Sequence, residues 1–255
     1  MYLQFYGLKE QPFTMSPDPK YIYYTPVHKE ALAQMTYAVR HNSSFMVLSG
    51  EVGTGKTSLI NALRKTLPDK YHVVVIAHAI FDPEGLIKSV CRGFGIRIRD
   101  ISVQDLLFEL QDHLDSLHMQ GKKPVLIFDE AQLLTAEILE HIRLLSNFET
   151  ESEKILRIIL VGQPELIDRL RVEELRALAE RVNLRYDLRP LTPVETGEYV
   201  IYRLEVAGFP AGYKLFSERV LELIYKFSDG VPRRINIYAD RTLMLGYARN
   251  MKYIE

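Results

Sequence analysis

The 255-residue sequence contains a single cysteine, Cys91, and no long apolar run. A lone cysteine excludes an intrachain disulfide and a metal site built from several cysteines, and it favours a reducing compartment. The longest apolar runs, residues 73–77 and 125–128, fall far below the roughly 18 residues of a membrane-spanning helix. Residues 1–7 also lack the basic start and apolar stretch of a signal peptide. We therefore expect a cytoplasmic protein without a transmembrane segment.

The sequence also has almost no net charge, because 32 Lys and Arg residues stand against 33 Asp and Glu residues. A formal charge of −1 provides no global field for holding a polyanion, so nucleic-acid binding would need a local basic patch. Internal repeats and low-complexity tracts are absent, and hydrophobic residues make up 47% of the chain. These features exclude the disordered, fibrous and solenoid classes and indicate a globular protein.

Short β-branched runs alternate with longer amphipathic stretches, which is typical of an α/β fold with a parallel sheet. Five strands are expected at residues 45–49, 72–77, 125–128, 156–161 and 184–188. Between the second and third, helices should begin near Pro83 and after Ser102, whose hydroxyl can cap the first turn. After Arg189 only helices are expected, near 193–207, 217–228 and 233–248, and residues 192–195 have the pattern of a capping box. We expect an α/β domain over residues 1–190, with an N-terminal arm and helix over 1–43, and a smaller helical domain over 191–255.

Residues 50–57 match the phosphate-loop pattern G-x-x-x-x-G-K-[ST] at every specified position. The loop follows an apolar strand and opens a helix, so its amides and the helix N-terminus can surround phosphates. The expected nucleotide-binding residues of this loop are Gly50, Glu51, Val52, Gly53, Thr54, Gly55, Lys56, Thr57 and Ser58. Lys56 should reach the β- and γ-phosphates of ATP, and the Thr57 hydroxyl is placed for Mg²⁺.

Two acids, Asp129 and Glu130, end the apolar strand at 125–128. We expect Asp129 to hold the magnesium shell and Glu130 to orient and polarise the attacking water. Gln163 follows the fourth strand and is a candidate for sensing the γ-phosphate, with a plain turn residue as the alternative. A water-activating glutamate favours hydrolysis over phosphoryl transfer to a small molecule. An adenylate- or nucleoside-kinase function is the competing hypothesis, but the sequence has no arginine-rich lid insertion.

Three arginines are candidates for contacts to a nucleotide. Arg176 and Arg181 end a helix just before the fifth strand, where an arginine delivered in trans to a neighbour's ATP would raise turnover by roughly 10³–10⁵. Favourable interaction with the helix C-terminus is the alternative for both. Arg233 opens the last helix, and because a cation at a helix N-terminus is unfavourable, we expect it to contact the nucleotide.

The N-terminal aromatic residues and the histidines carry weaker signals. The aromatic residues are Phe5, Tyr6, Phe13, Tyr21, Tyr23 and Tyr24. An adenine pocket or an interaction patch are alternatives for them, and core packing of an extended arm is the main expectation. No two of the seven histidines stand together with other residues that could bind a metal ion, so we expect them to be surface or core residues.

The order of these segments resembles the AAA+ ATPases, and among them the ExeA/GspA-like family of general secretion pathway ATPases. The resembling segments are residues 5–8, 12–13, 16–20, 50–57, 128–132, 144–149, 161–166, 188–191 and 230–233. The resemblance implies an ATPase domain with a five-stranded core, a helical lid and nucleotide bound at the domain junction. It further implies Gln163 as sensor 1, Arg233 as sensor 2, Arg181 as arginine finger, and subunits that assemble into a ring or arc.

Members of that family work at the bacterial inner membrane on secretin, pilus or polysaccharide export assembly. The resemblance thus implies an ATP-dependent homo-oligomer with a protein client, cytoplasmic or peripheral to the inner face of that membrane. Members often carry a membrane segment and a peptidoglycan-binding region after the ATPase, and this sequence ends at Glu255 without either, so cell-wall binding is not expected of this chain. Similar domains occur in transposition proteins that coat target DNA, and an ATP-dependent DNA-binding regulator is the alternative. Arginines between residues 169 and 189 favour it, whereas the interspersed acids and the near-zero net charge oppose it.

Overall fold

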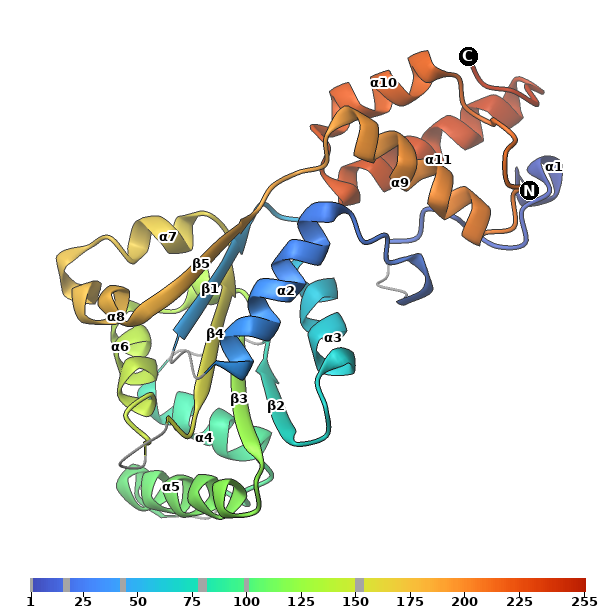
Figure 1. Ribbon diagram of the computed structural model, residues 1–255. Helices are drawn as coiled ribbons and strands as arrows, with labels where there is room; N and C mark the ends of the chain where they lie inside the picture. The colour runs from blue at the N-terminus through green and yellow to red at the C-terminus, as the bar shows by residue number, and fades with distance from the viewer. Residues whose placement is uncertain (1, 16–18, 42–44, 78–81, 99–100, 150–153) are drawn as a thin grey trace. The chain divides into compact units, whose positions relative to one another are not determined.

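The computed structural model describes residues 2–15, 19–41, 45–77, 82–98, 101–149 and 154–255 (Figure 1). The strands are β1 Phe45–Gly50, β2 Tyr71–Ile76, β3 Lys123–Phe128, β4 Arg157–Gly162 and β5 Val182–Leu188. The α-helices are α1 Tyr2–Tyr6, α2 Pro26–Arg40, α3 Lys56–Thr66, α4 Pro83–Gly93, α5 Val103–Met119, α6 Ala136–Leu145, α7 Glu165–Arg169, α8 Arg176–Arg181, α9 Pro193–Val206, α10 Glu218–Ser228 and α11 Pro232–Ala248. The short 3₁₀ helices are η1 Pro19–Tyr21, η2 Ala131–Leu133 and η3 Glu173–Leu175.

Contacts divide the chain into two compact units. The α/β unit comprises residues 30–50 and 59–188, and the helical unit comprises residues 1–29, 51–58 and 189–255. Residues 1–29, which were expected to belong with the α/β domain, therefore group with the C-terminal helices. Of the segments that carry the family resemblance, residues 16–18 lie outside the described residues.

The α/β unit is built on a five-stranded sheet in the order β2-β3-β4-β1-β5, with every pairing parallel. All five strands expected from the sequence are present, and their ends lie within two residues of the expected ones. Parallel neighbours need crossover connections, and helices α3 to α8 lie in the segments between successive strands. The predicted P-loop type of α/β fold, a parallel five-stranded sheet with a C-terminal set of helices, is confirmed.

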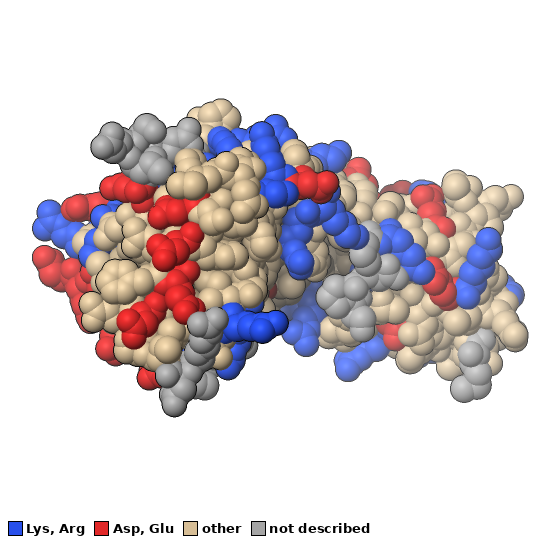
Figure 2. Space-filling model, turned by 90° about the horizontal axis from the view of Figure 1, so that it is seen from below, with Lys and Arg blue, Asp and Glu red and all other residues tan. Residues whose placement is uncertain are grey.

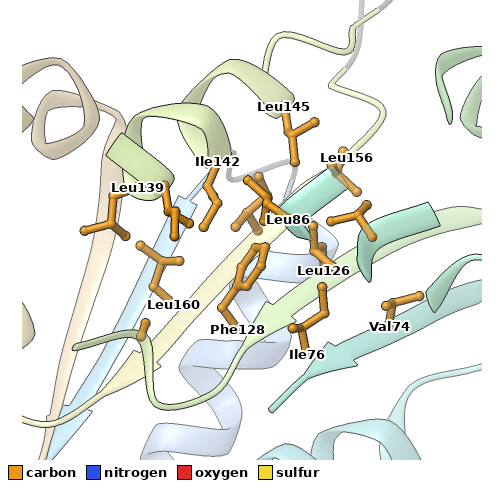
Figure 3. Close-up of a cluster of buried hydrophobic side chains, with 14 of the residues drawn as sticks. Val74, Ile76, Leu86, Leu126, Phe128, Leu139, Ile142, Leu145, Leu156 and Leu160 are labelled. Atoms are coloured by element: carbon orange, nitrogen blue, oxygen red, sulfur yellow. The ribbon is translucent and has the colours of Figure 1, made fainter. Parts of the chain in front are cut away.

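One face of this sheet carries the main hydrophobic core (Figure 3). Strand register aligns a first row of buried side chains, Val74, Leu126, Ile158 and Phe45, and a second row, Ile76, Phe128, Leu160 and Val47. Because successive strand residues alternate between faces, rows two residues apart share a face. Leu86 of α4 and Leu139 and Ile142 of α6 pack against these rows.

The opposite face of the sheet is buried as well. Met46, Leu48 and Ile159 alternate with the residues of the first cluster and are almost completely inaccessible. Met35 of α2 and Leu63 of α3 are also fully buried and lie outside that cluster. Burial of both faces requires strands that are apolar throughout, which explains why β1 and β4 are buried at every position and were recognisable from sequence.

The helical unit has its own core, formed by α9, α10, α11 and the N-terminal segment. Tyr2, Tyr6, Phe13 and Tyr21 are buried in this core, whereas Phe5 and Tyr23 are partly buried against it. The expected core packing therefore holds for Phe5, Tyr6, Phe13, Tyr21 and Tyr23, whereas Tyr24 is half-buried and is not among the residues of this core. No helix among the described residues is long and apolar enough to cross a membrane.

Arg203 of α9 connects the N-terminal arm to the C-terminal helices of the helical unit. The side chain is buried, its Nε donates a hydrogen bond to the Pro12 carbonyl at 2.6 Å, and one NH group donates to the Tyr199 hydroxyl at 2.8 Å. Its guanidinium lies 4.6 Å from the centre of the Tyr21 ring. A planar guanidinium is suited to this combination of stacking and hydrogen bonding. The contact joins residues almost 200 positions apart in the sequence.

The predicted capping box at the start of α9 is present. The Thr192 hydroxyl accepts a hydrogen bond from the Glu195 backbone N–H, and the Glu195 carboxylate accepts one from the Thr192 N–H. Arg189 donates two further hydrogen bonds to this carboxylate, at 2.9 and 3.2 Å. Arg189 and the Thr192 donors together lower the pKa of Glu195 to about 2. The box therefore begins α9 firmly and remains charged at all ordinary pH values.

Candidate functional site

Residues 51–55 of the phosphate-loop motif connect the end of β1 to α3, which begins at Lys56. Gly53 has φ 86° and Gly55 has φ 105°, a backbone region that side-chain-bearing residues rarely adopt. These two conformations turn the chain sharply ahead of the helix N-terminus. The motif therefore occurs where its chemistry requires it, after a buried strand and before a helix.

The loop is held by its own side chains. The Thr54 hydroxyl donates to the Glu51 carbonyl at 2.8 Å, and the Lys56 ammonium donates to the same carbonyl at 3.0 Å. Thr54 and Lys56 are only 1% and 6% exposed. The predicted phosphate-binding cation thus lies against the loop backbone.

A buried histidine, His28 of α2, also supports the loop. Its Nε2 lies 3.0 Å from the Thr54 carbonyl oxygen, and its Nδ1 lies 2.7 Å from the Thr25 hydroxyl. Since a carbonyl can only accept, Nε2 must carry the proton and Nδ1 accepts from Thr25. A Cβ at Gly55 would lie 3.1 Å from this Nε2, so the ring packs closely against the loop.

The role of His28 was missed in the sequence, where the histidines were assigned to the surface or the core. The available signal was Thr25-Pro-Val-His28, the pattern of a helix start. The Thr25 hydroxyl indeed accepts from the His28 backbone N–H at 3.3 Å. That pattern indicates a cap, but contact with Thr54 depends on the tertiary fold.

Replacement of His28 should weaken the acid sensitivity of folding. Burial lowers the pKa of His28 below its ordinary value of 6.5. The unfolded chain therefore binds a proton at a higher pH than the folded chain, and the free energy of unfolding falls as the pH drops below about 6.5. When the pH is lowered from about 7.5 to about 5.5, the free energy of unfolding of wild type should fall by up to about 1 kcal/mol more than that of His28→Gln.

Urea unfolding at a series of pH values measures this difference. His41→Gln, at an exposed position of the same N-terminal region, is the matched control and should follow wild type. Parallel stability curves for wild type and His28→Gln would contradict the buried, neutral state of this histidine.

Arg233 lies next to the phosphate loop within the helical unit. Its backbone N–H donates to the Gly53 carbonyl at 3.3 Å. A Cβ on Gly53 would lie 2.6 Å from the Arg233 Cβ and 3.3 Å from a Val231 methyl group. Glycine at position 53 therefore allows the start of α11 to contact the loop. This contact supports the predicted role of Arg233 at the nucleotide, and the reach of its guanidinium to a phosphate stays a prediction.

The two predicted acids stand at the carboxyl end of β3 in the α/β unit. Asp129 is 8% exposed, its N–H donates to the Ile76 carbonyl at 2.9 Å, and its Oδ1 accepts from the Glu130 N–H at 3.0 Å. Glu130 is exposed and has φ 54°, the left-handed region. A residue with a side chain pays on the order of 1 kcal/mol for that conformation, and such strain is concentrated at functional sites.

Gln163 follows β4 at the same edge of the sheet, as expected. Its N–H donates to Oε1 of Gln132 at 3.0 Å, and Nε2 of Gln132 donates to Oε2 of Glu130 at 2.7 Å. The α/β unit therefore brings Asp129, Glu130 and Gln163 together, with Gln132 between two of them. Gln132 was not among the expected site residues, although it lies only two residues after Glu130.

Arg181 has partners within its own chain. Its NH1 donates to the Ser146 hydroxyl and to the Asn147 side-chain oxygen, both at 2.7 Å, at the end of α6. Arg176 is exposed and pairs with Glu180 of the same helix at 3.0 Å. Both arginine side chains therefore have hydrogen-bond or ion-pair partners within this chain. Delivery of Arg181 to a neighbouring subunit stays a prediction.

Comparison with known proteins agrees with this arrangement. Residues 39–170 match the model of the family described as AAA domain. General secretion pathway protein A of Aeromonas hydrophila is 40% identical over 250 residues, 98% of this chain and 45% of that protein. Among solved structures, the ORC2 protein of Aeropyrum pernix has a TM-score of 0.68 at 18% identity, covering 97% of this chain and 69% of that one. Cdc6p of Pyrobaculum aerophilum has a TM-score of 0.70 at 20% identity, with coverages of 95% and 67%.

The two kinds of similarity support different statements. The solved structures share too little sequence with this chain to indicate more than the fold. The secretion protein shares the sequence over nearly the whole chain, although the chain spans less than half of that protein's length. Together with the family match, this shows that the chain belongs to the AAA domain family and is an ExeA/GspA-like member of it.

Proposed function

We propose that the chain binds ATP with Mg²⁺ and hydrolyses it to ADP and phosphate. The observation that carries the proposal is the loop of residues 50–57 between β1 and α3, with positive φ at Gly53 and Gly55. Inward-facing amides at a helix N-terminus are suited to a polyphosphate. Asp129 and Glu130 at the end of β3 add the acids that a hydrolase of this class needs.

The residues present suit a magnesium nucleotide. A threonine hydroxyl and a carboxylate are oxygen donors of the kind that Mg²⁺ prefers, so Thr57 and Asp129 would hold the ion, which would neutralise charge on the phosphates. The amides of residues 50–58 would bind the phosphate oxygens, and Lys56 would bind the β- and γ-phosphates. Both β1 and β3 end at the same edge of the sheet, since all pairings are parallel.

Glu130 and Gln163 would act on the attacking water. The Glu130 carboxylate accepts a hydrogen bond from the water, orients its oxygen toward the γ-phosphorus and would take up the proton that the water loses. As the new P–O bond forms, the bond between the γ-phosphorus and the bridging oxygen breaks, and ADP leaves with that oxygen. The Gln163 amide would hydrogen-bond to the γ-phosphate or to the same water. An exposed glutamate beside a buried aspartate favours this hydrolysis over transfer to a second substrate.

We further propose that this activity serves the assembly of a bacterial secretion, pilus or envelope-export apparatus, as a homo-oligomer with a protein client. The similarity to General secretion pathway protein A along 98% of the chain supports that assignment. A location in the cytoplasm, with peripheral association at the inner membrane, would suit such a client. In an oligomer Arg181 would serve a neighbouring ATP, and Arg233 would report the nucleotide to the C-terminal helices.

A DNA-directed role is the alternative, and one surface argues against it. Helix α5 carries Asp105, Glu109, Asp112 and Asp115 and has no Lys or Arg. Figure 2 shows acidic side chains gathered over part of the α/β unit, on a face that also carries a separate group of Lys and Arg side chains. The acidic part of this face would repel the phosphates of a duplex.

Phosphate release and particle mass, each measured with and without duplex DNA, test the proposal. We expect Mg²⁺-dependent ATP hydrolysis whose rate DNA does not change, and a particle mass that rises when ATP is added. Stimulation by DNA that weakens with added salt would favour the DNA-directed alternative. Absence of hydrolysis under all conditions would contradict the ATPase assignment itself.

A further inference from the structure

Gln132 of η2 contacts both predicted water-handling residues of the α/β unit. Its Nε2 donates to Oε2 of Glu130 at 2.7 Å, and its Oε1 accepts from the Gln163 backbone N–H at 3.0 Å. Within the described part of the chain, Gln132 is the side chain that holds the Glu130 carboxylate. It therefore links the end of β3 to the end of β4.

The orientation of the Gln132 amide follows from its two partners. A backbone N–H can only donate, so the amide oxygen must face Gln163, and an ionised carboxylate can only accept, so the NH₂ group must face Glu130. The site thus needs a donor and an acceptor on one planar group. Neither an apolar side chain nor a carboxylate at position 132 supplies both.

The rest of Gln132 is fixed to the end of β4 and to α7. Arg169 of α7 donates to the Gln132 carbonyl at 2.6 Å. At Gly162, a Cβ would lie 2.9 Å from Oε1 of Gln132 and 3.3 Å from its backbone nitrogen. A contact this short would force the Gln132 amide to shift, so glycine as the last residue of β4 leaves room for Gln132 in the observed position.

We infer that Gln132 is a positioning residue for hydrolysis, which sets the Glu130 carboxylate and fixes its position relative to Gln163. The inference rests on the proposed ATPase function. Glu130 is exposed and in a strained backbone conformation, so its carboxylate needs a tether to keep one direction. Gln132 provides that tether, and its other hydrogen bond is to the backbone of Gln163, the proposed γ-phosphate sensor that follows β4.

Replacing Gln132 should lower turnover without weakening nucleotide binding. We expect Gln132→Ala to reduce kcat about 10- to 100-fold with KM for ATP within about twofold of wild type, because misplacing a catalytic group affects the transition state alone. Gln111→Ala, an exposed amide on α5, is the matched control and should leave both constants unchanged. An unchanged kcat in Gln132→Ala would overturn the inference.

Gln132→Glu separates positioning from simple packing. This side chain has nearly the same size and can still accept from the Gln163 N–H, but it presents a second carboxylate to Glu130 in place of a donor. We expect kcat to fall at least as far as in Gln132→Ala, with a thermal midpoint close to wild type. If Gln132 only packs the loop, Gln132→Glu will retain wild-type turnover, and the inference fails.

A double substitution shows through which residue Gln132 acts. In a Glu130→Gln background, Gln132→Ala should cause little further loss, because residues that work as one unit are non-additive. A full, independent loss in the double variant would contradict action through Glu130. If wild type hydrolyses ATP and Gln132 variants behave normally, only this inference fails, whereas a wild type without hydrolysis overturns the proposed function as well.

Discussion

Glu130→Gln is expected to lower kcat for ATP hydrolysis by about 10²- to 10⁴-fold and to leave ATP affinity almost unchanged. The carboxylate orients and polarises the attacking water, and an amide of the same shape cannot accept the proton that water loses. Binding should survive because the exposed Glu130 side chain is held by Gln132, whereas the phosphates are assigned to residues 50–58. Single-turnover phosphate release and a separate titration with ATP measure the two effects.

The matched control for this substitution is Glu137→Gln, an exposed glutamate in the first turn of α6. It removes the same charge from a position outside the site and should hydrolyse ATP at the wild-type rate. Because Glu130→Gln should bind ATP without hydrolysing it, we expect this variant to stay in the oligomer of higher particle mass after ATP is added. Near-normal hydrolysis by Glu130→Gln would show that another group activates the water.

Lys56→Ala is expected to weaken ATP binding by about 10²- to 10⁴-fold. Charge-assisted hydrogen bonds to phosphate contribute about 1.5–3 kcal/mol each, and Lys56 is assigned two phosphates. Lys56 is buried and already lies against the loop, so the ammonium needs little rearrangement to serve there. Isothermal titration with Mg-ATP measures the loss directly.

Lys65→Ala provides the control, since Lys65 is an exposed lysine in the last turn of the same helix, α3. It should bind ATP as wild type does. Thermal unfolding of both variants checks that the loop still folds without the contact between Lys56 and the Glu51 carbonyl. Equal affinities of wild type and Lys56→Ala would contradict the phosphate assignment.

The features that sequence analysis predicted correctly depend on local interactions. The strands were recognisable because parallel strands covered on both faces are continuously apolar, as in β1 and β4. The caps at Ser102 and Thr192 were recognisable because a hydroxyl and its amide partner lie three residues apart. The phosphate loop combines such local geometry with an eight-residue pattern that few other structures require.

The features that sequence analysis missed depend on contacts between distant segments. Arg203 fixes Pro12 across 191 positions, and no periodic pattern in residues 1–29 reveals that they pack with α9 and α11. The sequence around His28 indicates a helix start, and that around Gln132 a short turn. Their contacts with Thr54 and Gln163, however, form only because the tertiary fold brings these distant segments together. Predicting them would have required the order of the strands in space.

A structure of the wild-type protein with Mg²⁺ and a non-hydrolysable ATP analogue tests the central claim most directly. We expect the β- and γ-phosphates to accept hydrogen bonds from the amides of residues 51–57 and from Lys56, with the ion bound by Thr57 and Asp129. We also expect Glu130 to face the γ-phosphate while still bonded to Gln132. A nucleotide bound elsewhere, with the loop of residues 50–57 free of phosphate at saturating analogue, would contradict the account.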